Sequence, residues 1–129
     1  IMVTIENFVN MLRKADALTY LNDFLQQNDD LLEIAFPDEN DFYEIDDHAE
    51  DSEIIKTIQN IFHKSGRNFI DQNLANEMME IQKLYCTCGE IFHSKLLEFG
   101  ADIDMGDQMA QIFTPLIYER FDRIFNVTN

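Results

Sequence analysis

Two pairs of acidic residues have a spacing that suits the binding of a metal ion. Glu77 and Glu80 are three residues apart, and Glu119 and Asp122 repeat this spacing. Because residues three apart share one side of a helix, each pair can present two carboxylates to the same cation. Hard cations such as Mg²⁺ prefer oxygen ligands of this kind. The four residues are therefore candidate metal ligands, although acids at this spacing are also common on solvated helix faces.

The two acidic pairs together resemble the magnesium site of the all-α nucleoside triphosphate pyrophosphohydrolases. The resemblance implies a metal-dependent release of pyrophosphate from a nucleotide, with the four carboxylates as ligands. It covers these short motifs alone, and the 38 residues between them are more than that family leads us to expect. No lysine-rich phosphate-binding segment lies nearby. The enzyme is therefore an alternative, and we expect a non-catalytic protein without a cofactor.

Other metal-binding patterns are incomplete. Glu90 and His93 have the Glu-x-x-His spacing of di-iron bundles, but those sites need two such motifs and this chain has one. Cys86 and Cys88 are separated by one residue, whereas zinc-binding cysteines are usually separated by two to four. The acids that begin at Asp102 lack the glycine and glutamate that a calcium-binding loop requires at its sixth and twelfth positions. We therefore expect no metal centre from these residues, and two free thiols in a reducing compartment.

The overall charge narrows the class of partner. The chain has 129 residues, with 25 acidic and 9 basic side chains and a formal net charge of −16. A surface of this sign does not attract nucleic acid phosphates or an anionic membrane, so we expect neither as a direct partner. A basic protein is the partner that this charge favours.

Most of the negative charge lies in one stretch of the chain. Residues 29–53 contain 12 acids and no Lys or Arg, whereas the other 104 residues contain 13 acids and 9 bases, a net charge of −4. The centre of this stretch, residues 36–51, is either a solvated loop between two helices or a binding surface. Phe42, Tyr43 and Ile45 lie among the acids. They serve either as contacts with a partner or as side chains that pin the loop to the core.

The binding hypothesis assigns the acids and the two neighbouring aromatic residues to one surface. Its carboxylates would pair with Lys and Arg of the partner, and Phe42 and Tyr43 would supply buried contacts. The candidate partner-binding residues are Asp38, Glu39, Asp41, Phe42, Tyr43, Glu44, Asp46, Asp47, Glu50 and Asp51.

This surface leads to a functional hypothesis of an acidic inhibitor. Proteins that bind nucleic acid have basic clefts because phosphate contacts dominate their affinity, and an acidic surface can occupy such a cleft. Immunity proteins, antitoxins and phage-encoded inhibitors of nucleases act in this way as classes. The alternative is a helical adaptor or oligomer subunit that binds through an apolar helix face, with Phe121, Ile124, Phe125 and Val127 as the candidate face. The sequence leaves the oligomeric state open.

The residue pattern predicts that helices position these groups. Apolar residues recur at helical spacing, alternating runs are short, and only two prolines and four glycines interrupt the chain. We expect an all-α fold, a single domain over residues 1–129 with five or six helices and the acidic segment between two of them. No apolar run is long enough to cross a membrane and no signal peptide is evident, so a cytoplasmic protein is expected.

The helix boundaries are predicted from capping residues and prolines. Thr4, Asp16 and Ser52 are expected to cap three helices, and Asn28–Asp30 to interrupt the second, which Pro37 ends. The longest helix is expected to start at Asp71 or Asn73 and to end at Gly100, with a possible bend at Gly89. The last is expected to start at Asp107 and to kink or restart at Pro115.

Overall fold

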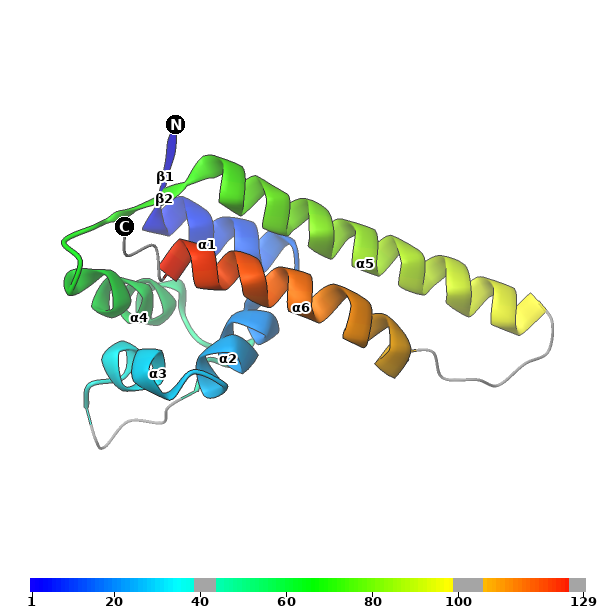
Figure 1. The fold of residues 1–129 in the computed structure, drawn as a ribbon, viewed down its shortest axis with the longest axis horizontal. Helices are drawn as coiled ribbons and strands as arrows, with labels where there is room; N and C mark the ends of the chain where they lie inside the picture. Colours follow the sequence, from blue (N-terminus) through cyan, green and yellow to red (C-terminus); the bar gives the residue numbers. More distant parts are fainter. Residues whose placement is uncertain (39–43, 99–105, 126–129) are drawn as a thin grey trace.

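The computed structural model describes residues 1–38, 44–98 and 106–125, which form six helices and one two-stranded sheet (Figure 1). The helices are α1 (Ile5–Lys14), α2 (Leu18–Gln26), α3 (Asp29–Ala35), α4 (Asp51–His63), α5 (Gln72–Glu98) and α6 (Gly106–Phe125). The strands are β1 (Met2–Thr4) and β2 (Phe69–Asp71). The predicted all-α fold is confirmed. Among the described residues, no helix has both the length and the apolar character that crossing a membrane requires.

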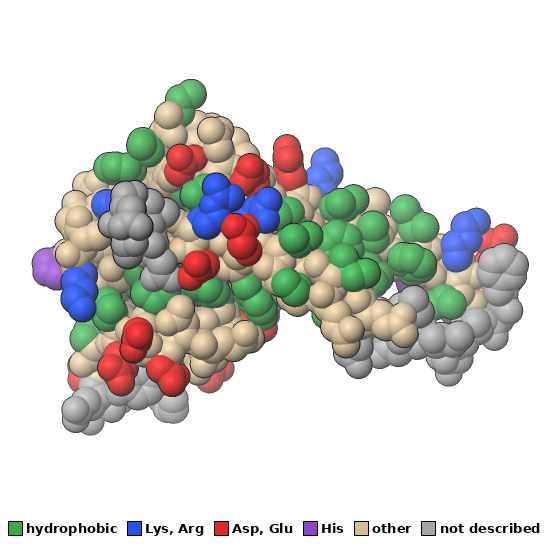
Figure 2. Space-filling view, viewed as in Figure 1, with side chains coloured by type: hydrophobic (Ala, Val, Ile, Leu, Met, Phe, Trp, Pro, Cys, Tyr) green, Lys and Arg blue, Asp and Glu red, His purple; other side chains and the backbone are tan. Residues whose placement is uncertain are grey.

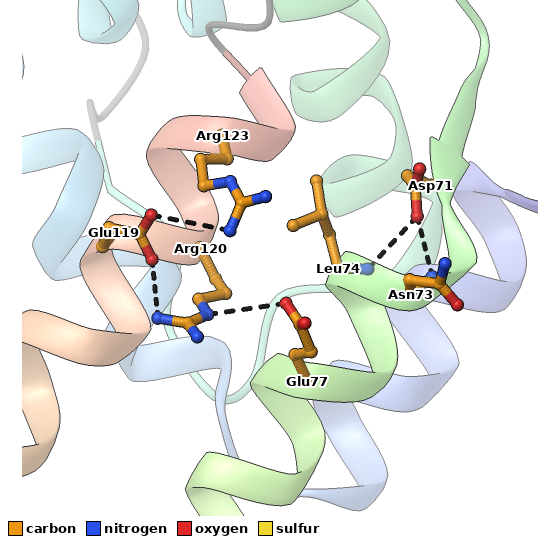
Figure 3. A network of polar contacts seen from close by, with 7 residues as sticks. All are labelled: Asp71, Asn73, Leu74, Glu77, Glu119, Arg120 and Arg123. Atoms are coloured by element: carbon orange, nitrogen blue, oxygen red, sulfur yellow. Dashed lines mark hydrogen bonds and ion pairs between the residues drawn. The ribbon is translucent and has the colours of Figure 1, made fainter.

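Three helices begin where local capping chemistry predicts. The side chain of Thr4 accepts a hydrogen bond of 3.1 Å from the amide of Asn7 at the start of α1. Asn28 accepts one from Leu31 and separates α3 from α2. At α5, the carboxylate of Asp71 accepts from the amides of Asn73 and Leu74, at 2.8 and 3.3 Å (Figure 3). These bonds satisfy amides that the first helical turn leaves without partners.

Two predicted caps are wrong. Asp16 does not cap α2, which begins at Leu18 after a residue without a side-chain cap. Asp16 instead has a φ of 56°, and its carbonyl and that of Ala15 accept hydrogen bonds from Gln82 of α5. Ser52 lies inside the first turn of α4, which begins one residue earlier. The tight turn before α2 is therefore stabilised by Gln82, which is distant in the sequence, and not by a local side-chain cap.

The two short strands were not predicted. β1 and β2 pair antiparallel, with Val3 opposite Ile70, and both of these side chains are buried. Each strand has three residues, which is too short for an alternating pattern to be distinguished in the sequence. The pair joins the start of α1 to the start of α5.

Aromatic side chains join α2, α4 and α6 in the core. The ring of Phe24 lies 5.5 Å from that of Phe121, and the ring of Phe62 lies 5.6 Å from that of Phe125. The guanidinium of Arg67 covers the Phe62 ring and donates a hydrogen bond of 2.8 Å to a carbonyl in the last turn of α6. These contacts fix the C-terminal half of α6 in the body of the protein.

α5 and α6 extend beyond this body. Residues 83–98 of α5 and 106–116 of α6 lie side by side and project away from the other helices (Figure 1). We call this two-helix projection the arm. α6 is one helix through Pro115, so the predicted restart is wrong, and the hydroxyl of Thr114 donates to the carbonyl of Ala110 in the turn before the proline.

Candidate binding surfaces

Arg13 of α1 anchors the end of the acidic segment. Its guanidinium donates to the carboxylate of Asp51 at 2.8 Å, to the carbonyl of Ala49 at 2.9 Å and to that of Asp47 at 3.5 Å. The side chain is partly exposed, so its ion pair with Asp51 is screened by solvent. By bonding to these three positions, the Arg13 side chain holds residues 47–51 against the end of α1.

Ile45 and Asn22 hold the preceding part of the segment. The side chain of Ile45 is 4% exposed and belongs to the hydrophobic core. Its amide donates a hydrogen bond of 2.9 Å to the side chain of Asn22 in α2. Next to it, the carboxylate of Asp46 accepts from the amide of His48 at 2.8 Å and closes a turn. Ile45 therefore pins the segment to the core, which decides between the two roles that the sequence left open for this residue.

The anchored residues leave several carboxylates exposed. Asp38, Glu44, Asp46, Asp47 and Glu50 are all exposed at the surface. Asp51 is half exposed and is paired with a base of the same chain. The other predicted contacts, Glu39, Asp41, Phe42 and Tyr43, lie outside the described residues.

A groove of about 710 Å³ lies between the acidic segment, α3 and α4. Four carboxylates line it among the described residues, from Asp38, Glu44, Asp46 and Glu53, against a single lysine, Lys56. Clefts lined by one sign of charge concentrate the electric field and attract the opposite charge. Figure 2 also shows acidic side chains gathered over α3, at the lower left of the view. The groove therefore carries the negative charge of this surface into a recess between the acidic segment, α3 and α4.

The four candidate metal ligands do not form a ligand set. Within the part of the chain that the structure describes, no group of three or more His, Cys, Asp or Glu side chains is placed to hold a metal ion. Arg120 lies between Glu77 and Glu119, 3.7 Å from the carboxylate of the first and 2.6 Å from that of the second (Figure 3). Arg123 also contacts Glu119, at 3.7 Å. The described structure therefore does not gather Glu77, Glu80, Glu119 and Asp122 as a ligand set, and Arg120 instead pairs with one acid of each predicted pair.

The apolar face predicted on the last helix is part of the core. Phe121, Ile124 and Phe125 are all buried, and Val127 lies outside the described residues. The exposed apolar residues of α6 lie closer to its N-terminal end. These are Ile112 and Leu116, which face solvent in the arm. Helical spacing showed that this helix is amphipathic along its length, and only the packing of α2 and α4 shows which half is covered.

The arm also carries exposed apolar residues on α5 that were not predicted as a binding surface. Leu84, Ile91 and Phe92 are large, apolar and about half exposed. One sequence signal was available, because the apolar residues of α5 spread over more of its circumference than one buried stripe requires. Figure 2 shows hydrophobic side chains gathered on the arm, over α5 and beside α6.

Aromatic rings connect the base of the arm to the body. The ring of Tyr85 in α5 stacks on Phe113 of α6 at 5.0 Å and lies 6.1 Å from that of Tyr20 in α2. Burial raises the pKa of the Tyr20 phenol well above its usual range, and the neighbouring Tyr85 raises it further. Burial also raises the pKa of Tyr118, with a further contribution from Asp23. These phenols therefore resist ionisation in the folded protein.

The raised pKa of Tyr20 predicts a loss of stability in alkali. In the unfolded chain the phenol ionises from about pH 10. The folded chain retains the proton to higher pH, so the stabilisation is complete below about pH 10 and is lost as the pH rises above it. Between about pH 9 and about pH 11, the free energy of unfolding measured in urea is expected to decrease less for Tyr20→Phe than for the wild type. An equal decrease in both proteins would contradict this assignment.

Comparison with known proteins finds no relative of this chain: no protein-family model, no curated protein and no solved structure matches it.

Proposed function

We propose that this chain is a non-catalytic binding protein that neutralises a basic partner through residues 36–51 and the adjoining groove. The observation that carries the proposal is the anchoring of residues 45–51. Arg13, Asn22 and the buried Ile45 hold the backbone, while the carboxylates around them stay exposed. A surface that is ordered before binding loses less entropy when a partner docks. The acids are therefore arranged as a recognition surface rather than as a solvated chain.

A nuclease or another nucleic-acid-binding protein is the partner class that fits this surface. The basic cleft of such a protein neutralises phosphate charges along a backbone, and its affinity depends on those contacts. A fixed row of carboxylates competes for the same Lys and Arg side chains and excludes the nucleic acid. This mode of action is that of an immunity protein, an antitoxin or a phage-encoded inhibitor.

The groove supplies a specific contact within this broader charge attraction. Glu44, Asp46 and Glu53 line it from two sides, so an inserted arginine meets carboxylates on both. Arginine pairs with carboxylates through two parallel hydrogen bonds, which fixes orientation as well as adding affinity. We therefore expect one arginine of the partner to insert here, with the exposed acids of residues 46–50 contacting its surroundings.

Charge reversal at two exposed acids tests the proposal. The variant Glu44→Lys/Asp47→Lys changes two exposed side chains, whereas the bonds described above that anchor the segment use the amide of Ile45 and the backbone carbonyl of Asp47. Titration against a panel of basic nucleases and DNA-binding proteins is expected to find a wild-type partner whose binding weakens as salt rises. The variant is expected to bind that partner at least about tenfold more weakly, because each like-charge contact opposes association.

The matched control changes the net charge by the same amount elsewhere. Glu80→Lys/Glu90→Lys alters two exposed acids of α5. This control is expected to retain most of the binding, since its charges lie outside the acidic segment. Equal weakening in both variants would show that net charge alone drives binding, and the assignment to residues 36–51 would then fail.

A further inference from the structure

The arm has an apolar face that no described part of the chain covers. Helical spacing places Leu84, Cys88 and Ile91 on one side of α5, and places Ile112 and Leu116 together on α6. The Tyr85–Phe113 stack sets the two helices in register at this point. We call Leu84, Cys88, Ile91, Phe92, Ile112 and Leu116 the arm face. Its five large apolar side chains are each 41–63% exposed.

The arm has almost no core of its own. In the described part of α5, no residue after Gln82 is buried, although this helix continues for another 16 residues. In the arm half of α6, Met109 is buried, and the side chain of this residue reaches within 3.9 Å of a methyl group placed on Gly89. Two helices paired along one narrow seam leave most of their apolar surface in water. A further pair of helices against the arm face would bury that surface.

The arm face differs in charge from the rest of the molecule. From Leu84 to Glu98 the chain has two acids and one base, and from Gln108 to Leu116 it has no charged residue. Two copies of a chain with a net charge of −16 repel each other across most of their surfaces. The arm is the region where two copies meet with least repulsion, and it offers few carboxylates to a basic partner. Its charge therefore matches a second copy of this chain.

The area of the arm face is compatible with contact between two copies of this chain. An aromatic side chain carries roughly 150–250 Å² of surface and Leu and Ile carry less, so the five half-exposed side chains present roughly 400 Å² of apolar surface. Patches of this size are the largest on ordinary monomers and are often functional. A standard interface buries about 800 Å² on each partner, and the apolar side chains of the arm face supply about half of that area.

We propose that the arm face packs against the arm face of a second copy, so that the two arms form a four-helix bundle. Because the same surface is used by both copies, the dimer has two-fold symmetry and closes without further growth. The bundle supplies the arm with the core that its own two helices lack. The acidic segments belong to the bodies and stay outside this interface.

Sedimentation at several concentrations and at raised salt tests the proposal. Wild-type protein is expected to reach twice its monomer mass of 15.2 kDa at micromolar concentrations. Added salt is expected to preserve or strengthen the dimer, because it screens the repulsion between the two bodies. The variant Leu84→Gln/Ile112→Gln is expected to raise the dissociation constant at least about tenfold. Circular dichroism checks that this variant keeps its helices, as expected for two exposed positions.

Leu97→Gln is the matched control within the same arm. Leu97 is 65% exposed, and helical spacing turns it about 120° away from Ile91, off the arm face. This variant is expected to dimerise as the wild type does. A wild type that stays monomeric at all concentrations, or equal loss of dimer in both variants, would overturn the proposal.

The two cysteines give a second measurement that does not depend on a variant. Cys88 lies on the arm face, whereas Cys86 is exposed and about 200° away around the helix. A thiol-specific reagent is expected to modify Cys88 more slowly as the protein concentration rises, while Cys86 keeps a constant rate. Equal rates at all concentrations would count against the arm face. The result is independent of the acidic surface, whose partner binding weakens with salt, so the two proposals can fail separately.

Discussion

Replacing Phe121 with alanine is expected to lower the free energy of unfolding by about 3–5 kcal/mol. The side chain is fully buried, and its ring lies 5.5 Å from that of Phe24 and 6.0 Å from that of Phe125. The substitution removes the ring contact between Phe24 and Phe121 that joins α2 to α6, and it leaves a cavity that rigid neighbours fill only in part. Urea unfolding followed by circular dichroism measures the change.

Leu97→Ala is the control for this measurement. It also shortens a large apolar side chain, but at an exposed position, so the free energy of unfolding is expected to change by no more than about 0.5 kcal/mol. The comparison distinguishes a buried from an exposed apolar position on the α5–α6 pair. A Phe121→Ala protein of near wild-type stability would show that this residue is a surface contact, as the sequence suggested, and not part of the core.

Replacing Ile45 with alanine is expected to cost about 2–3 kcal/mol of stability. This side chain is buried, but it also lines the groove, so water can enter the space that it leaves and limit the loss. The substitution removes no carboxylate. It is nevertheless expected to weaken binding to the basic partner, because it releases the backbone that positions Glu44 and Asp46.

Glu44→Ala provides the comparison for Ile45→Ala. Its exposed side chain contributes little to folding, so the expected change in stability is within about 0.5 kcal/mol. If Ile45→Ala unfolds at the wild-type urea concentration, the segment is not held by this residue. Arg13 and Asn22 would then be the residues that hold the acidic segment.

The two surfaces use different physical interactions and lie in different parts of the molecule. The acidic segment and groove lie on the body and attract an opposite charge, so salt weakens their contacts. The arm face is apolar and close to neutral, and its association withstands salt. A dimer joined through its arms would therefore carry two acidic surfaces, one on each body.

Local signals in the sequence predicted the helices and several of their ends. Thr4 and Asp71 act within a few residues of themselves, so their capping bonds depend on little beyond the adjacent turn. The prediction failed for Asp16 because Gln82, 66 residues away, donates a hydrogen bond to its carbonyl. No local pattern records a bond across that separation.

Residue spacing also showed which side chains share a helix side, without showing what lies opposite. The spacing of Glu77 with Glu80 and of Glu119 with Asp122 suits a cation, but it is also common on solvated helix faces. The packing of α5 on α6 places Arg120 between Glu77 and Glu119 instead. Arg13 likewise contacts a segment that contains no Lys or Arg. It lies 38 residues before Asp51, the residue with which it pairs.

The sequence by itself determined the helical class and the location of the negative charge, because helical periodicity and formal charge depend on residue identity and order. The tertiary structure decided which apolar residues are buried. Phe121 and Ile112 lie on the same amphipathic helix, but α2 packs on the first and the second is 63% exposed. Burial is a property of the neighbours that a side chain meets. The core, the anchored acidic segment and the uncovered arm face therefore became visible only when the helices were packed together.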